Sequence, residues 1–297
     1  MKKILFLAAA TFALMACNND DNEVNEPVAA QISATIGKSA VTRASETSWA
    51  NGDEIGITMT GNDINYVNMK YTTGGNGKFT GTPMYFKNHI DPMNLTAYYP
   101  YKGDEGTLPA LIEASTGADN QTSDKQPEFD FLYASLENIT GSNPNIEFTF
   151  AHKMSKITFI FEDGNIGTDV SKITSYQIDG LILEGTFNPA TGVCAANNVA
   201  PESLTMTTTG VEKGKQLPSL IVFPQATAGK TVTMKIKDSE KQDYACTLNF
   251  GDDGIVAGNN YQYTIKVSKT GLTVNSNITD WIDNRLASEA KSDDSDD

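Results

Sequence analysis

Three cysteines and two histidines carry the side chains best suited to covalent or acid–base chemistry in this chain of 297 residues. His89 and His152 do not form a pair at the spacing of metal ligands, and neither an HExxH motif nor a Cys/His cluster accompanies them. The G-x-S-x-G motif of serine hydrolases is also missing. The sequence therefore predicts no catalytic residue, no metal, no cofactor and no enzyme activity. We expect His152 to be a packed or capping histidine rather than a general base.

Cys17 is the cysteine whose surroundings predict a covalent modification. Two lysines precede an apolar stretch at residues 4–14, which is shorter than the roughly 20 residues of a membrane-spanning helix. An alanine before a cysteine at the end of such a stretch resembles the signal of bacterial lipoproteins, which are cut before the cysteine and acylated on it. We predict a signal peptide over residues 1–16 and lipidation of Cys17. The alternative is an ordinary signal peptide that is cut nearby.

An acidic segment follows at residues 17–27. Residues 18–23 contain three carboxylates and no apolar side chain, which predicts a solvated linker between the lipid anchor and the fold. Acidic residues directly after a lipidated cysteine also resemble the surface-export signal of lipoproteins of the Bacteroidota. The predicted location is therefore the cell outer membrane, with the protein exposed on its surface.

Alternating apolar residues at 28–36 predict a half-buried strand, because every second side chain of a strand lies on the same face. The apolar face consists of Ala30, Ile32, Ala34 and Ile36. Arg43 follows and is the only arginine before Arg285. Two interpretations are open for this segment: a permanent first strand with Arg43 as a loop cation, or a removable strand with a cleavage site behind it.

Cys194 and Cys246 also leave two alternatives open. A disulfide between them is compatible with an oxidising compartment. Cys246 lies, however, on the apolar face of an alternating segment, where a free cysteine behaves as a small hydrophobic residue. We favour two free, buried thiols.

Composition narrows the class of protein. The formal net charge of −15 argues against a nucleic-acid partner, because the chain would repel the phosphate backbone. A hydrophobic content of 39% is sufficient for packed cores. Apolar residues alternate with period two outside the leader, and long helical periodicity is missing, so we predict an all-β fold.

Two features divide the β-rich body. The apolar residues change from even positions at 146–150 to odd positions at 157–161, which predicts a bulge or a crossing between domains near Lys153–Lys156. Residues 102–128 are rich in Gly, Asp, Ser, Thr and Pro, and we expect a long surface loop there. We predict an N-terminal β-sandwich domain over residues 28–150 and a C-terminal one over residues 151–283.

Three apolar alternations in the second half, at residues 232–236, 244–250 and 261–267, predict three consecutive antiparallel strands. A last strand is expected at residues 272–278. The polar and mostly acidic residues 284–297 are predicted to be disordered.

Short motifs spread over residues 42–281 resemble the fimbrillin-like lipoproteins of the Bacteroidota. Their order and spacing carry the resemblance more than any single motif does. The motifs are Thr42-Arg43-Ala44 ahead of Trp49-Ala50-Asn51-Gly52-Asp53-Glu54, then Ala97-Tyr98-Tyr99-Pro100-Tyr101, Asp130-Phe131-Leu132-Tyr133-Ala134, Phe150-Ala151-His152-Lys153-Met154-Ser155, Tyr261-Gln262-Tyr263 and Ile278-Thr279-Asp280-Trp281.

This resemblance implies two tandem transthyretin-like β-sandwich domains and a structural or adhesive role as a subunit of a fimbria, the type V pilus. It implies that an arginine-specific or trypsin-like protease cuts between Arg43 and Ala44, and that an extended strand of another subunit replaces the first strand. If the C-terminus is the donor, its strand contains Leu272, Val274, Ile278 and Trp281. The implied partners are other fimbrial subunits, the outer membrane through the lipid anchor, and a ligand on a host or bacterial surface.

A surface glycan-binding lipoprotein that does not polymerise is the alternative function. Its sugar platform would be built from tyrosines, although aromatic packing between strands explains these residues equally well. The tyrosines concerned are Tyr66, Tyr71, Tyr98, Tyr99 and Tyr101.

Overall fold

Strands form nearly all of the regular structure. The computed structural model describes residues 26–37, 48–61, 63–164, 169–227, 229–240, 243–268 and 271–281. Its other regular elements are the short 3-10 helices η2 (Ala118–Asn120), η3 (Gln126–Glu128) and η4 (Val170–Lys172). The predicted all-β class is therefore confirmed. Residues 1–16, Cys17, Arg43, Ala44 and residues 284–297, for which the sequence predicts a leader, two processing sites and a tail, lie outside the described residues.

The N-terminal strands hydrogen-bond around a closed barrel in the order β10-β2-β5-β4-β3-β7-β9. Alternation builds its core, because Ile55, Ile57 and Met59 are fully buried while the residues between them are less apolar. A separate pair, β1 (Val28–Ala29) and β6 (Tyr85–Phe86), lies beside the barrel. The barrel strands are β2 (Gln31–Ile36), β3 (Asn51–Gly61), β4 (Ile64–Gly74), β5 (Lys78–Gly81), β7 (Met93–Tyr99), β9 (Leu132–Ile139) and β10 (Asn145–His152).

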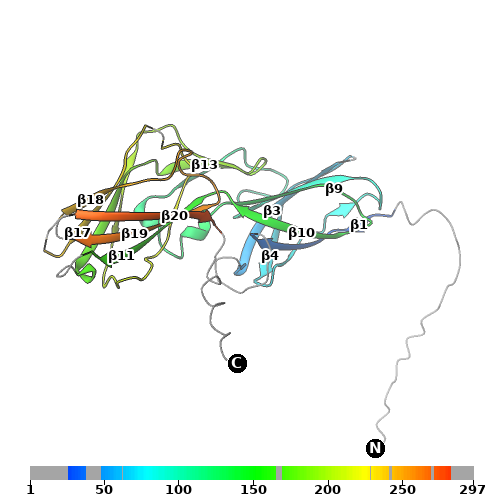
Figure 1. The fold of residues 1–297 in the computed structure, drawn as a ribbon. Helices are drawn as coiled ribbons and strands as arrows, with labels where there is room; N and C mark the ends of the chain where they lie inside the picture. The colour runs from blue at the N-terminus through cyan, green and yellow to red at the C-terminus, as the bar shows by residue number, and fades with distance from the viewer. Residues whose placement is uncertain are drawn as a thin grey trace, which may run out of the picture.

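The C-terminal strands form two four-stranded sheets that share one hydrophobic core, at the opposite end of the molecule from the barrel (Figure 1). The first sheet contains β16 (Leu220–Val222), β11 (Ser155–Asp163), β19 (Asn259–Ser268) and β20 (Gly271–Asp280), in that order. The second contains β15 (Glu202–Thr207), β12 (Ile173–Leu181), β17 (Val232–Asp238) and β18 (Asp243–Leu248), in that order.

The prediction of three consecutive antiparallel strands in this half is wrong for the third strand. β17 and β18 do pair antiparallel, but β19 lies in the other sheet, parallel to β11 and antiparallel to β20. The alternation of apolar residues gives the buried face of each strand and does not identify its neighbour. Both sheets bury their apolar faces in the same core, so the chain crosses between them without a change in the pattern.

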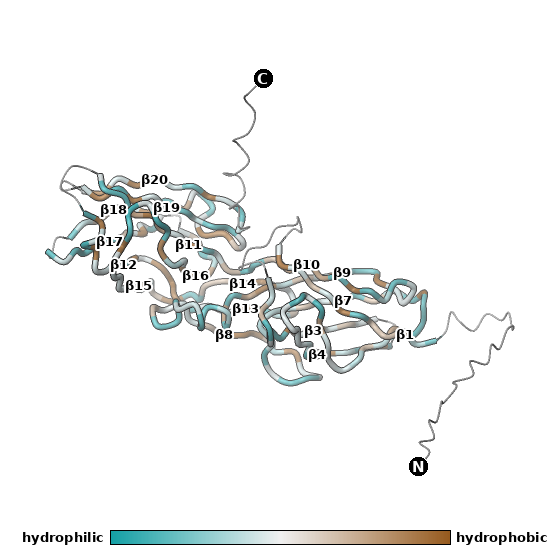
Figure 2. Tube along the Cα trace, turned by 90° about the horizontal axis from the view of Figure 1, so that it is seen from below, coloured by the Kyte–Doolittle hydropathy of each residue, from teal (hydrophilic) through white to brown (hydrophobic). Residues whose placement is uncertain are grey.

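A three-stranded sheet lies between the barrel and the sandwich (Figure 2). It consists of β8 (Ile112–Ser115), β13 (Glu184–Asn188) and β14 (Val193–Ala196). The prediction that residues 102–128 form a loop is therefore wrong for β8, which pairs with β13 from far along the chain. The four residues of β8 form a strand because they pair with β13, and their own sequence pattern does not predict a strand.

The predicted break in parity is confirmed. β10 ends at His152 and β11 begins at Ser155, and the two strands belong to different sheets. Lys153 and Met154 connect them, so the even positions of β10 point into the barrel and the odd positions of β11 point into the sandwich core. The division into two folding domains near residue 150 stays a prediction.

Phe148 and Phe161 test that division, since each ring is fully buried in one of the two cores. Phe148→Ala and Phe161→Ala should each lower the free energy of unfolding by about 3–5 kcal/mol, through lost burial and a cavity. Hydrogen exchange read by peptide mass spectrometry should rise in the barrel strands for the first variant and in the sandwich strands for the second. If both regions exchange faster in both variants, they unfold as one unit and the predicted division is wrong.

Candidate functional site

Strand β2 closes the barrel between two neighbours of very different length. It pairs parallel with β10 over six residues, from Gln31 opposite Asn145 to Ile36 opposite Phe150. On its other side it pairs antiparallel with β5 at two positions, opposite Phe79 and Lys78. The ladder with β10 therefore carries most of the backbone pairing of β2.

The burial of β2 follows the alternation that predicts it. Ile32 and Ala34 retain 5% and 2% of their exposure, and Ala30 and Ile36 pack against the same core. Burying one isoleucine side chain stabilises a fold by about 1.5–3 kcal/mol. The sequence-based prediction of a half-buried first strand is confirmed, and its absence would leave an apolar groove between β5 and β10.

Trp49 fixes β2 from inside the barrel. Its Nε1 donates a buried hydrogen bond of 2.8 Å to the carbonyl oxygen of Ala34. The indole packs edge-on against Phe79, Tyr99 and Phe150, with ring centroids 5.0, 5.6 and 5.3 Å away. Sequence analysis missed this role and placed Trp49 in a turn; the only available signal was a large aromatic ring directly before a polar turn.

The barrel is closed at β9 and β10 by very little pairing. Their ladder contains Ala151 opposite Tyr133 and His152 opposite Leu132. Among the described residues, positions 145–150 of β10 pair with β2 alone. Loss of β2 would therefore leave six consecutive residues of β10 without a strand partner.

The predicted donor residues lie on or next to β20. This strand is at the edge of its sheet and pairs antiparallel with β19. Leu272 and Val274 are half-buried against the sandwich core, whereas Ile278 is 43% exposed. Trp281 follows the end of the strand and is 7% exposed.

The ends of β2 and β20 line the same cavity, which has a volume of about 350 Å³. Ile36 and Trp49 contribute to its wall from the barrel, and Lys156 and Trp281 contribute from the sandwich. His152 also lines it, and its ring stacks on Trp281 with a centroid distance of 3.9 Å and an interplanar angle of 8°.

His152 is held in place on its other side by an acidic partner. Its Nδ1 lies 2.9 Å from Oδ1 of Asp130, and Nζ of Lys156 lies 5.3 Å from the centre of the Trp281 ring. The prediction that His152 is a packed histidine is confirmed. The Nε1 atom of Trp281 is buried and has no hydrogen-bond acceptor among the described residues.

Both described cysteines are free and half-buried, so the predicted pair of free thiols is confirmed. Cys194 packs against a buried cluster that contains Phe131, Phe187 and Trp281, at the junction between the barrel and the sandwich. Cys246 packs against the sandwich core. Burial raises the pKa of Cys194 to about 12, and the nearby Asp130 adds to this effect. Burial likewise raises the pKa of Cys246 to about 11. Since the thiolate is the reactive form, neither residue is an activated nucleophile at neutral pH.

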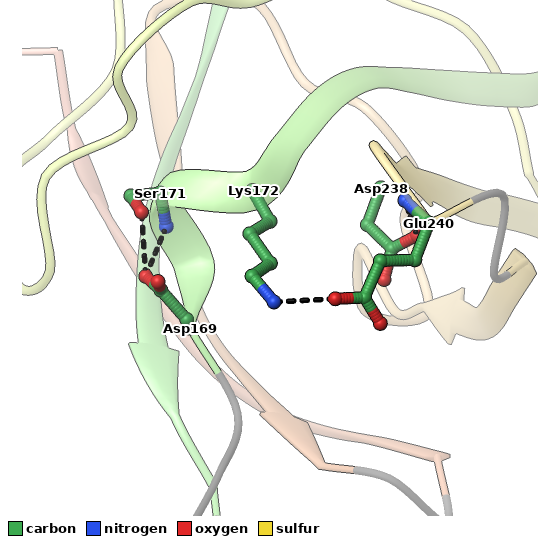
Figure 3. Close-up of polar contacts among 5 residues, drawn as sticks. All are labelled: Asp169, Ser171, Lys172, Asp238 and Glu240. Carbon is green, nitrogen blue, oxygen red and sulfur yellow. Dashed lines mark hydrogen bonds and ion pairs between the residues drawn. The ribbon is translucent and has the colours of Figure 1, made fainter.

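A second group of charged residues lies on the exposed surface of the sandwich, at Asp169, Lys172, Asp238 and Glu240 (Figure 3). Lys172 donates a hydrogen bond to Glu240 within an ion pair. This hydrogen bond is the largest cause that raises the pKa of Lys172, and the negative charges of Glu240, Asp169 and Asp238 raise it further. Asp169 accepts hydrogen bonds from the backbone and the hydroxyl of Ser171 and so begins η4. This surface pair is solvated and is of little value for stability.

The described residues contain no group of three or more His, Cys, Asp or Glu side chains arranged to hold a metal ion. In the same residues, no helix has the length and apolarity needed to cross a membrane. The candidate functional features are strand β2 with the apolar groove that it fills, and the cavity at which β2 and β20 end.

Comparisons with known proteins agree on one family. Residues 42–281 match the model of the family described as fimbrillin-like. The chain is 30% identical to Fim1C, a candidate fimbrium subunit of Bacteroides uniformis, over 95% of this chain and 96% of Fim1C. It is similar to the crystal structure of a candidate cell adhesion protein of Bacteroides ovatus, with a TM-score of 0.72, 27% identity, and coverage of 87% of this chain and 98% of that one. A candidate cell adhesion protein of Bacteroides uniformis gives a TM-score of 0.68 at 27% identity, over 86% of this chain and 99% of its own.

Trp49→Phe should weaken the attachment of β2, because it leaves the buried carbonyl of Ala34 without its donor. We expect a loss of about 1–3 kcal/mol in the free energy of unfolding, measured by urea titration. Trp281→Phe is the matched control, since its indole N–H has no acceptor to lose among the residues that the structure describes. An equal effect of the two substitutions would contradict a specific role for the bond between Trp49 and Ala34.

Proposed function

This chain belongs to the fimbrillin-like family, and on that premise we propose that it is a structural or adhesive subunit of a cell-surface fimbria, assembled by strand exchange. The observation that supports this most is the position of β2. It fills an apolar groove, it carries most of the pairing of β10, and it precedes Arg43 in the chain. Departure of such a strand would leave the backbone groups of β10 unpaired and open the apolar pockets that Ile32 and Ala34 fill.

Cleavage at Arg43 would turn β2 into a separate peptide. Arg43 falls between Gly37 and Ser48, which end and begin described segments on either side of it. Once the bond to Ala44 is cut, β2 has no covalent link to the remaining fold and is held by its contacts alone. An incoming strand with alternating apolar residues would restore the ladder to β10 and fill the groove, which is the strand-addition mode of recognition.

Strand β20 is the proposed donor. It pairs with one neighbour, and most of its residues are exposed, so its departure uncovers a limited apolar area. Leu272, Val274 and Ile278 alternate along it and would supply the side chains for the pockets left by Ile32 and Ala34. Edge strands present unpaired backbone groups, which suits them to leave one sheet and enter another.

Lipidation of Cys17 is the proposed means of export to the outer membrane. Several acyl chains on one cysteine hold a protein on a membrane far better than a single chain does. The linker over residues 17–27 would then separate the anchor from the barrel, and cleavage at Arg43 would detach the mature subunit from its anchor.

The alternative of a glycan platform has little support from the predicted tyrosines, because Tyr71, Tyr98 and Tyr99 are buried and Tyr66 packs against the barrel core. The two tryptophans at the cavity do not offer a platform in their place. Trp281 is already covered by His152 and approached by Lys156, and Trp49 is enclosed by three aromatic rings. Sugar binding on aromatic side chains requires an exposed ring face, and both rings are at least nine-tenths buried.

Arg43→Ala should block processing and assembly together. Treatment of the folded wild-type chain with an arginine-specific protease should release the fragment that ends at Arg43 and allow oligomers to form, whereas Arg43→Ala should keep residues 1–43 attached and stay monomeric. Mass spectrometry and size-exclusion chromatography measure the two outcomes. Arg285→Ala removes the other arginine and is the matched control. A processed chain that loses β2 and remains monomeric at every concentration would rule out strand exchange.

Cys17→Ala should abolish incorporation of a palmitate analogue when the protein is produced in a bacterium that lipidates its own lipoproteins. Cys194→Ala should label like the wild type, because that thiol is half-buried within the fold. Labelling is detected by fluorescence after gel separation. Unchanged labelling of Cys17→Ala would contradict the lipoprotein assignment.

A further inference from the structure

We propose that β10 couples the two halves of the exchange within one subunit: while β2 is in place, β10 holds His152 against Trp281 and keeps β20 docked, and loss of β2 releases β20. This inference rests on the proposed function. Its basis is that one short strand contacts both elements. Residues 145–150 of β10 pair with β2, and His152, the last residue of the same strand, stacks on the residue that follows β20.

The position of β10 depends on β2 more than on any other strand. The ladder between them spans six residue pairs, and Gly37 N–H extends it by donating to the carbonyl oxygen of Phe150, at 2.8 Å. Without β2, the described pairing of β10 is reduced to its two positions opposite β9. That short ladder includes His152, whose ring also keeps its contact with Asp130, so loss of β2 would weaken the hold on His152 by removing the support of residues 145–150.

Trp49 adds a second connection between β2 and the junction. It bonds to the backbone of β2 at Ala34 and packs on Phe150 of β10, two residues before His152. Departure of β2 would remove the acceptor from the Trp49 indole and the Ile36 side chain from the cavity wall. Both changes loosen the side of the cavity that faces His152.

Strand β20 pairs with β19 along its whole length, and its most buried apolar contact lies at the end that His152 contacts. Leu272 and Val274 are half-buried and Ile278 is exposed, whereas the large indole of Trp281 is 7% exposed. The backbone N–H of Trp281 also donates to the carbonyl oxygen of Gly258 at 2.6 Å. Trp281 is therefore the chief apolar anchor of this edge strand.

The indole N–H of Trp281 is a further feature of this end of β20. Its buried Nε1 has no acceptor among the described residues, and a buried donor without a partner opposes burial. Stacking on His152 is one of the contacts that offset this cost, beside the buried side chains of the cluster that contains Trp281. Loosening of His152 would weaken the docking of Trp281, and His152 is in this sense a positioning residue for the donor strand.

The coupling gives assembly an order. An unprocessed chain has a filled groove and a docked β20, so it is neither an acceptor nor a donor. Removal of one strand, β2, would open the groove and free β20 in the same subunit. Precursors would then not polymerise before processing, although they carry both halves of the interaction.

Hydrogen exchange at residues 271–281 of the full chain, read by peptide mass spectrometry, tests the coupling. Removal of β2 by the arginine-specific protease should accelerate exchange there by about tenfold or more, while β12 and β17 stay protected. His152→Ala in the uncut chain should accelerate residues 271–281 in the same way and leave β2 protected. His89→Ala, at the other histidine of the chain, should change neither region.

A second arm does not depend on the protease. Ile32→Asp places a carboxylate in the barrel core of the uncut chain, which should expel β2 and again accelerate residues 271–281. If β2 leaves in either arm and residues 271–281 keep wild-type exchange, the coupling is overturned. If the protease fails to release β2 but Ile32→Asp frees β20, the coupling stands and the proposed processing step fails.

Discussion

The parallel ladder between β2 and β10 is the interaction on which the N-terminal half of the structure depends. It closes the barrel at a seam where β9 and β10 barely pair, and it brings Ile32 and Ala34 over the core. A strand near the chain end that completes a core by pairing is stable as long as it is present, and its absence leaves backbone groups and apolar pockets unsatisfied at the same place. Stability and the capacity to accept a partner therefore come from the same residues.

The sandwich does not share this dependence. Its core is enclosed by two complete sheets, and β11 is buried on both faces near its start, at Ser155, Lys156 and Thr158. The strand that departs from it in the proposed exchange is β20, which contributes only half-buried residues to that core. In the proposed exchange the two halves would have different tasks, one to lose a core strand and be refilled, and one to stay folded when an edge strand leaves.

Local alternation was enough to predict the all-β class, the inward face of residues 28–36 and the break between Phe150 and Ile157. These features depend on neighbouring residues, whose faces are fixed by the geometry of a single strand. The position of β19, the existence of β8 and the clamp from Trp49 to Ala34 were not predictable, because each depends on which distant segment lies alongside. The contact between His152 and Trp281 belongs to the same class. Sequence motifs marked both residues, and only the fold brings them together.

The chain contains two tryptophans, Trp49 and Trp281, and both line the cavity where β2 and β20 end. One indole is bonded to the strand that is proposed to leave first, and the other follows the strand that is proposed to leave second. The tryptophan emission of this protein therefore originates at a single place in its structure. Departure of either strand changes the polarity around one of these two fluorophores, so the spectrum follows maturation in real time and needs no added dye.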